Sequence, residues 1–159
     1  MKKTFSVLFV CLGNTCRSPL AEAILKSELK KAGIKKVNVS SSGTGAFEGA
    51  RASSGSAVTA RQMGLSLAGF RSKPLTRLRV RRADLILTMT ASQKREVRDR
   101  WPEDADKVFT LSEYSGTGEG DVSDPVGSPL SAYQRCGDRL NADIKRIIPR
   151  LRKAVKSRR

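Results

Sequence analysis

A cysteine and an arginine with five residues between them are the pair in this sequence best suited to chemistry. Cys11 follows the apolar residues 7–10, and Arg17 closes the intervening stretch. A thiolate is a strong nucleophile, and a guanidinium can hold two oxygens of a phosphoryl group in a fork. We therefore interpret the pair as a site where a phosphoryl group passes to the Cys11 sulfur and then to water.

The residues around this pair predict a strand, a tight loop and the start of a helix. Residues 7–10 are apolar without alternation, which is typical of a strand covered on both faces. Gly13 and Asn14 tolerate a positive φ, and we expect the Asn14 amide to fix the shape of the loop. Ser18 is predicted as the N-cap and Pro19 as the first helical residue.

A loop in front of a helix is predicted to bind an anion. The N–H groups of residues 12–17 would converge on one point, and the helix N-terminus would favour the thiolate form of Cys11. Ser18 has two readings, as a plain N-cap or as a hydroxyl that donates a hydrogen bond to the thiolate. A buried, inert cysteine beside a surface arginine is the alternative. The position of Cys11 at a strand end favours the functional interpretation.

The remaining thiols give little support for a metal site. The chain has no histidine, and Cys11, Cys16 and Cys136 are its only cysteines, so a zinc ion would lack ligands. We expect no metal and no organic cofactor. An odd number of cysteines argues against a disulfide framework and favours the reducing cytoplasm. Cys136 is expected to serve packing in the C-terminal helix.

The sequence carries a net charge of +16, with basic clusters at 71–82, 94–100 and 145–159. Such a charge suits nucleic acid, anionic membrane or acidic proteins. It also suits a solvated surface that steers anions to the site, which we favour because no aromatic stacking set or nucleic-acid motif accompanies it. No apolar run is long enough to span a membrane, and the start of the chain reads as a strand and not as a signal peptide. We therefore expect no nucleic-acid and no membrane partner.

Strands and helices alternate along the chain, which predicts an α/β fold with a parallel sheet. Right-handed crossovers place helices on both faces of four strands, giving three layers with the anion loop after the first strand. We expect one domain over residues 1–159, with a frayed basic tail at 156–159. After the first strand, the predicted strands are 37–41, 83–89 and 107–111, and the predicted helices are 19–33, 56–63, 75–82, 90–100 and a long one from 130. Pro149 is expected to kink or end that last helix, and 112–129 reads as a mobile loop.

A general acid must come from a carboxylate, since the chain has no histidine. Asp124 is the best candidate, because Pro125 restricts its backbone and the loop around it could close over a substrate. Asp121 is the local competitor, with a solvated loop charge as its simpler interpretation.

The stretch Cys-Leu-Gly-Asn-Thr-Cys-Arg-Ser-Pro at 11–19 resembles the signature of the low-molecular-weight protein phosphatases. Residues 40–44 resemble the end of the second strand of that family, and Ser123-Asp124-Pro125 resembles its acid loop. The similarity covers residues 5–150. It implies four parallel strands, a phosphocysteine intermediate on Cys11, and Asp124 as general acid and later as the group that orients or deprotonates water.

The resemblance also implies which residues bind the substrate and which respond to oxidation. The candidate phosphate- and substrate-binding residues are Leu12, Gly13, Asn14, Thr15, Cys16, Ser18 and Phe47. Phe47 has two readings, as ordinary packing under its loop or as an apolar wall of the cleft. Cys16 has two as well, as a small apolar residue or as the partner in a reversible disulfide that protects Cys11, which the family pattern favours.

Thr15 and Val126 bear on the choice of substrate. Phosphotyrosine enzymes of the family usually carry Ile where this chain has Thr15, and the protein-arginine phosphatases resemble this chain in carrying Thr. A hydroxyl can accept a hydrogen bond from a guanidinium leaving group. Val126 departs from the aromatic residue that both groups tend to place after Asp-Pro. The resemblance thus favours a monomeric phosphoarginine phosphatase that acts on proteins and releases inorganic phosphate.

Three alternatives remain beside that reading. A protein-tyrosine phosphatase would use the same chemistry with a different leaving group. An arsenate reductase on the same scaffold would need further cysteines within 80–95, and there are none. A non-catalytic phosphate-binding module is less consistent with Cys11, Arg17 and Asp124 together.

Overall fold

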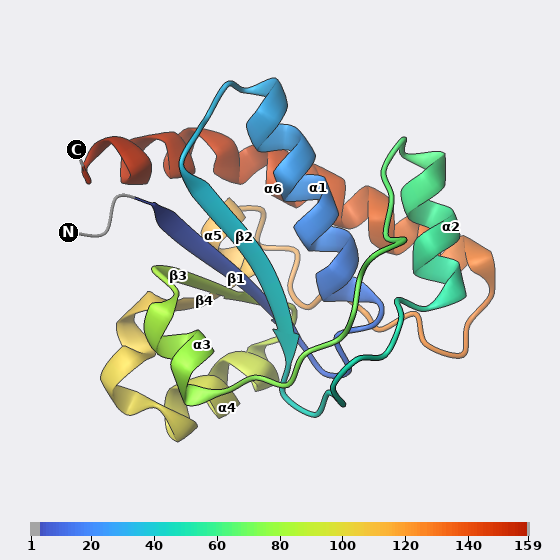
Figure 1. Cartoon of the computed structure of the whole chain (residues 1–159), viewed down its shortest axis with the longest axis horizontal. Helices are drawn as coiled ribbons and strands as arrows, with labels where there is room; N and C mark the ends of the chain where they lie inside the picture. The colour runs from blue at the N-terminus through green and yellow to red at the C-terminus, as the bar shows by residue number, and fades with distance from the viewer. Residues whose placement is uncertain (1–3, 159) are drawn as a thin grey trace.

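The predicted strands form one parallel sheet in the computed structural model, which describes residues 4–158 (Figure 1). The order across the sheet is β2-β1-β3-β4, and every neighbouring pair is parallel. The strands are β1 (Phe5–Cys11), β2 (Val37–Gly43), β3 (Leu85–Thr88) and β4 (Val108–Thr110). The helices are α1 (Arg17–Lys31), α2 (Ser54–Gln62), α3 (Arg77–Arg82), α4 (Ala91–Arg100), the 3₁₀ helix η1 (Pro102–Lys107), α5 (Leu111–Ser115) and α6 (Leu130–Lys156).

Strand β1 is buried on both faces, which confirms the interpretation of its unbroken apolar run. Val7 and Phe9 pack with residues of α1 and α6, whereas Leu8 and Val10 pack with residues of α3 and α4. Figure 1 shows the same division, with α1 and α6 on one side of the sheet and α3 and α4 on the other. The three-layer α/β architecture is therefore confirmed.

The first helix begins one residue earlier than its predicted cap. Cys16 occupies the N-cap without a side-chain capping bond, and Arg17 is the first helical residue. The prediction that Ser18 is the N-cap and Pro19 the first helical residue was wrong. The Ser18 hydroxyl is instead engaged with Cys11 and Asn14, so it is not free to cap the helix.

The short helix α5 begins at the last residue of a predicted strand and extends into the segment that was predicted as a loop. Thr110 and Glu113 form a capping box at its start, each side chain hydrogen-bonded to the backbone of the other. The Thr-x-x-Glu spacing is a sequence signal that was available for this helix. Residues 116–129 are the part of the predicted loop without regular structure, apart from a turn at its end.

Helix α6 continues through Pro149 to Lys156. Ile147 and Leu151 flank the proline and are fully buried, while Pro149 itself is exposed. Packing of this apolar stripe holds the helix together across the lost hydrogen bond. The frayed tail at 156–159 stays a prediction; of its described residues, Lys156 is the last residue of α6, and Arg158 pairs with Asp84 and lies over the Phe5 ring at 5.3 Å. Arg159 lies outside the described residues.

The sheet order places the reactive loop at its topological switch point. The chain leaves β1 toward β2 on one side, and β3 pairs with β1 on the other. Open α/β sheets bind ligands in the crevice at this point, beyond the carboxyl ends of the strands. Within residues 4–158, no helix is both long enough and apolar enough to cross a bilayer.

Candidate active site

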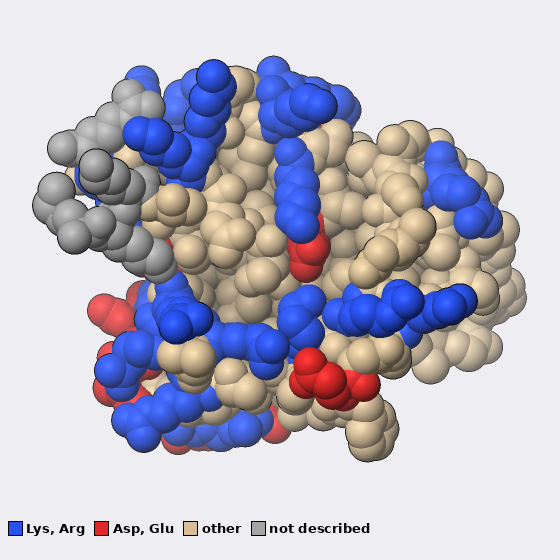
Figure 2. All heavy atoms as spheres, in the orientation of Figure 1, with Lys and Arg blue, Asp and Glu red and all other residues tan. Residues whose placement is uncertain are grey.

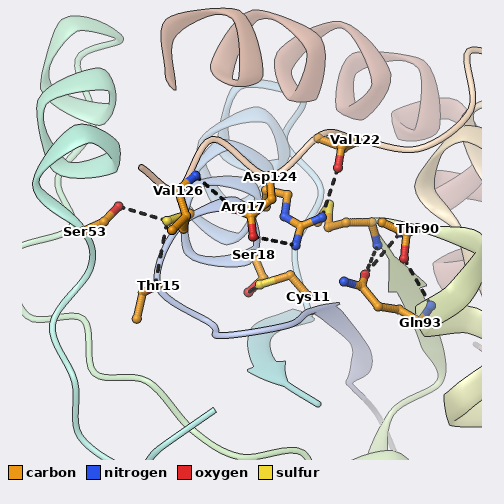
Figure 3. Close-up of polar contacts among 12 residues, drawn as sticks. Cys11, Thr15, Arg17, Ser18, Ser53, Thr90, Gln93, Val122, Asp124 and Val126 are labelled. Carbon is orange, nitrogen blue, oxygen red and sulfur yellow. Dashed lines mark hydrogen bonds and ion pairs between the residues drawn. The ribbon is translucent and has the colours of Figure 1, made fainter. Parts of the chain in front are cut away.

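Cys11 is the last residue of β1, and its sulfur lies at the base of the loop that leads into α1. The side chain is 2% exposed, and its Sγ is 2.9 Å from the Ser18 hydroxyl (Figure 3). That hydroxyl accepts a hydrogen bond from the Asn14 amide at 2.8 Å. Because its lone pair is engaged there, the Ser18 proton is available to the Cys11 sulfur, which would stabilise a thiolate.

Asn14 holds the loop in shape with all of its hydrogen-bonding groups. It is fully buried with a positive φ of 55°. Its amide nitrogen donates to Ser18 and to Ser41 at 3.0 Å, and its oxygen accepts from the Lys73 N–H at 2.9 Å. Ser41 in turn donates to Glu22 at 2.8 Å. The loop is thus tied to α1, to β2 and to the segment before α3 by one satisfied network.

The end of β2 approaches the loop so closely that only glycine fits at Gly43. A Cβ atom there would lie 2.4 Å from the Leu12 carbonyl oxygen. The next two N–H groups donate to this loop, from Thr44 to the Cys11 carbonyl and from Gly45 to the Leu12 carbonyl. These bonds fix the first half of the loop from the β2 side.

Arg17 reaches from the first turn of α1 toward the sulfur and the acid loop. Its side chain is buried, with Nη1 donating to the Val122 carbonyl at 3.0 Å and Nη2 lying 3.4 Å from an Asp124 carboxylate oxygen. The buried Nε has no hydrogen-bond partner among residues 4–158. A guanidinium held in this way keeps N–H donors for an anion above Cys11 (Figure 3).

The structure separates the two candidate carboxylates. Asp124 faces the pocket, and its other oxygen accepts from the Val126 N–H at 3.1 Å. Asp121 points away and accepts from the Ala91 N–H at 2.9 Å, at the start of α4. A carboxylate there complements the positive end of a helix. Asp121 is thus a helix-capping group, which neither sequence interpretation included.

These residues surround a pocket of about 340 Å³. Its rim is apolar and open: Phe47 is 86% exposed, Val126 61% and Leu12 54%. Phe47 is therefore not packed under its loop, and the cleft-wall interpretation fits. The lining residues are Cys11, Leu12, Gly13, Thr15, Cys16, Arg17, Gly45, Phe47, Ala50, Ser72, Asp124 and Val126. Asn14 and Ser18 support this pocket from below and do not line it.

Cys16 has polar neighbours that the sequence analysis did not identify. Its thiol lies 3.2 Å from the Ser53 hydroxyl and 3.9 Å from the Tyr133 hydroxyl. Burial, followed by the charge of Cys16, raises the pKa of Tyr133 above its usual value. Ser53 was detectable as the N-cap of α2, but no local pattern marks Tyr133, which arrives from α6. All three cysteines are free, and burial raises the pKa of Cys136 to about 12.

The fold and this pocket define a class of enzyme that binds an oxyanion over a cysteine. The low molecular weight phosphotyrosine protein phosphatase family model matches residues 6–157. The chain belongs to this family, which confirms the resemblance and the assignment to the phosphatases.

Individual relatives divide between two substrate names. Protein-arginine-phosphatases of Geobacillus stearothermophilus and Bacillus subtilis are 36% and 37% identical to the chain over 147 residues, covering 92% of it and 96–97% of themselves. A probable low molecular weight protein-tyrosine-phosphatase, EpsP, of Ralstonia nicotianae is 34% identical with 92% and 96% covered. A solved structure of the YwlE arginine phosphatase, a cysteine-to-serine variant with a phosphorylated active-site serine, superimposes with a TM-score of 0.90 at 36% identity, covering 94% of this chain and 97% of that one.

Proposed function

We propose that this enzyme hydrolyses phosphoarginine in proteins through a phosphocysteine intermediate on Cys11. The observation that carries the proposal is that Cys11 and Arg17, at the two ends of the loop after β1, line one pocket with Asp124 from a distant loop. The protein is then a single-domain monomer of the cytoplasm, with phosphorylated proteins as substrates and inorganic phosphate as a product. Size-exclusion chromatography with light scattering tests the monomer.

In the first step, the Cys11 thiolate attacks phosphorus and the phosphorus–nitrogen bond breaks. Asp124, in its acid form, gives its proton to the departing arginine nitrogen. In the second step, the Asp124 carboxylate takes a proton from water, the water oxygen attacks phosphorus, and the phosphorus–sulfur bond breaks. Inorganic phosphate leaves, and the thiolate and the protonated acid are restored.

Arg17 and the N–H groups of residues 12–17 hold the phosphoryl oxygens in both steps. Their dipoles are fixed before the substrate arrives, so they stabilise developing charge without reorganisation. The Ser18 hydroxyl, 2.9 Å from the sulfur, stabilises the thiolate as attacking and as leaving group.

Thr15 and Asp124 support arginine as the leaving group. Thr15 lines the pocket, and within residues 4–158 the one hydrogen-bond partner of its hydroxyl is the Cys16 sulfur at 3.8 Å. That oxygen is therefore free to accept an N–H of a guanidine, and the acid form of Asp124 can donate its proton to the leaving nitrogen. The names of two relatives agree with this choice.

Tyrosine is the second candidate substrate, because the exposed Phe47, Leu12 and Val126 side chains can pack against an aromatic ring. The test is hydrolysis of matched phosphoarginine and phosphotyrosine peptides by the wild type and by Thr15→Ile. We expect the wild type to prefer phosphoarginine and the variant to shift toward phosphotyrosine. A wild-type preference for tyrosine would overturn the substrate choice and leave the phosphatase mechanism standing.

Cys16 is proposed to protect the nucleophile by forming a reversible disulfide with Cys11. We expect peroxide to inactivate the wild type in a manner that dithiothreitol reverses. Cys16→Ser should lose this recovery, because the Cys11 sulfur then proceeds to irreversible oxidation states. Full recovery of the variant would remove the protective role.

A further inference from the structure

A second hollow, which we call the arginine pocket, lies beside the catalytic pocket. It encloses about 430 Å³ between α2 and the segment before α3. Arg51, Arg61 and Arg71 line it, and all three side chains are exposed. On the face drawn in Figure 2, one basic side chain lies over α2 and others run along the segment beside it. The rest of the lining is small or apolar: Ala52, Ala57, Ser66, Leu67 and Ala68.

The linings of the two hollows are adjacent in the chain where two segments meet at Ala50 and Ser72. These two residues are joined by two hydrogen bonds, from the Ala50 N–H to the Ser72 hydroxyl at 2.9 Å and from the Ser72 N–H to the Ala50 carbonyl at 2.7 Å. Both line the catalytic pocket, whereas their neighbours in the chain, Arg51 and Arg71, line the arginine pocket. One extended peptide can therefore enter both, because a residue advances the chain by roughly 3.5 Å.

The charge of the arginine pocket is not compensated within the part of the chain that the structure describes. No Asp or Glu lines it, and Arg51, Arg61 and Arg71 form no ion pair there. Arginines elsewhere do pair, such as Arg77 with Glu103. Three guanidiniums that line one hollow repel one another, and a bound anion would relieve that repulsion and accept their forked donors.

We propose that the arginine pocket is a subsite for an acidic side chain or a second phosphate on the protein whose phosphorylated residue occupies the catalytic pocket. This proposal rests on the proposed function, and it makes acidic flanking sequence a determinant of substrate choice. Because adjacent residues line the two pockets, we expect the anionic group about two to four positions from the phosphorylated residue in an extended chain.

The experiment compares three phosphoarginine peptides that differ only near the phosphorylated residue. They carry glutamate, phosphoserine or glutamine at the positions two to four residues away on either side. We expect kcat/KM of the wild type to be about three- to tenfold higher with either acidic group than with glutamine, as two or three exposed charge pairs allow. The glutamate and phosphoserine peptides separate a carboxylate site from a phosphate site.

Two variants test whether the preference for acidic peptides depends on the arginine pocket. Arg51→Gln with Arg61→Gln should bring the ratio between acidic and neutral peptides close to one and leave the neutral peptide unchanged. The matched control is Lys35→Gln with Arg152→Gln, which removes the same charge at the opposite end of the sheet, where Arg152 contacts the Ala32 carbonyl. The control should keep the wild-type ratio. A ratio that stays high in the pocket variant, or falls equally in both, would overturn the proposal.

Binding separates this proposal from the proposed function. Fluorescence anisotropy of the same peptides with the Cys11→Ala protein, which has no nucleophile at this position, reports affinity without phosphoryl transfer. If the wild type hydrolyses none of the peptides, the proposed function fails. The arginine pocket still stands or falls on whether Arg51→Gln with Arg61→Gln abolishes the tighter binding of the acidic peptides. Preference for duplex DNA over these peptides in a competition would also overturn it.

Discussion

The loop after β1 and the acid loop face each other across the catalytic pocket and are built in opposite ways. In the first, Asn14, Arg17 and Ser18 are buried, and Asn14 uses both ends of its amide. In the second, residues 116–129, only Val122 and Pro125 are buried. The loop after β1, which we propose as the phosphate cradle, is thus fixed by its own hydrogen bonds, while the proposed acid, Asp124, sits on exposed chain held at two points.

This difference matches the two tasks. Holding a phosphoryl group benefits from donors that do not reorganise. A general acid must meet leaving groups attached to whole proteins, and exposed segments with few buried contacts open at little cost. Asp124 lies between the two buried residues of its loop, and the Val122 carbonyl accepts from Arg17. This hydrogen bond therefore ties the acid loop directly to Arg17 of the phosphate cradle.

Cys11→Ser tests the cradle most severely. We expect kcat to fall roughly 10⁴-fold or more, because the nucleophile is lost while the binding groups remain. Inorganic phosphate should still bind, as measured by calorimetry. Cys136→Ser is the matched control and should keep wild-type turnover. Appreciable hydrolysis by Cys11→Ser would mean that the sulfur does not form the intermediate.

Asp124→Asn tests the acid loop and should have the next largest effect. We expect kcat to fall roughly 10²- to 10⁴-fold, the range that a general acid contributes, with phosphate affinity retained. Asp121→Asn changes the same charge three residues away, where the side chain caps α4, and should lower thermal stability slightly with little change in kcat. An equal fall in kcat for Asp124→Asn and Asp121→Asn would contradict the choice of Asp124 as the general acid.

Asn14→Gly tests whether the rigidity of the cradle is what matters. Glycine accepts the positive φ of this position, so the loss reports on the hydrogen bonds to Ser18, Ser41 and Lys73. Leaving such buried groups unpaired should cost about 2–4 kcal/mol of unfolding free energy and lower kcat about tenfold to a hundredfold. Denaturant unfolding and steady-state kinetics measure both. Asn38 is exposed and lies in β2. Asn38→Gly is therefore the control for an Asn-to-Gly change outside the loop, and it should keep the wild-type kcat.

The cradle could be predicted from sequence because its determinants are local. An apolar strand, a loop with Asn14, and Cys11 and Arg17 at its ends lie within a dozen residues, and the pattern gave both the strand and the anion site. The predicted N-cap was wrong, because the Ser18 hydroxyl is hydrogen-bonded to Asn14 and Cys11 in the folded loop. The position of Tyr133 beside Cys16 and the Ala50–Ser72 pair could not be predicted, because both depend on contacts between residues far apart in the sequence. Helix α5 was missed although its capping box was visible.

Cys136 offers the mildest test of the contrast between a reactive and an inert thiol. Burial raises its pKa to about 12, so the folded protein keeps this thiol protonated throughout the range from pH 6 to 9. Only the thiolate reacts with iodoacetamide, and we therefore expect Cys136 to remain unlabelled over that range while Cys11 is alkylated. Peptide mass spectrometry with the Cys16→Ser protein follows the two sites separately.

The raised pKa of Cys136 fixes the expected pH dependence of its labelling. Raising the pH toward 9 should not increase labelling of Cys136 until the protein unfolds. A steady rise in labelling between pH 7 and 9 in the folded enzyme would show that this thiol is exposed to solvent, and that the packing of α6 against the acid loop is looser than the structure indicates.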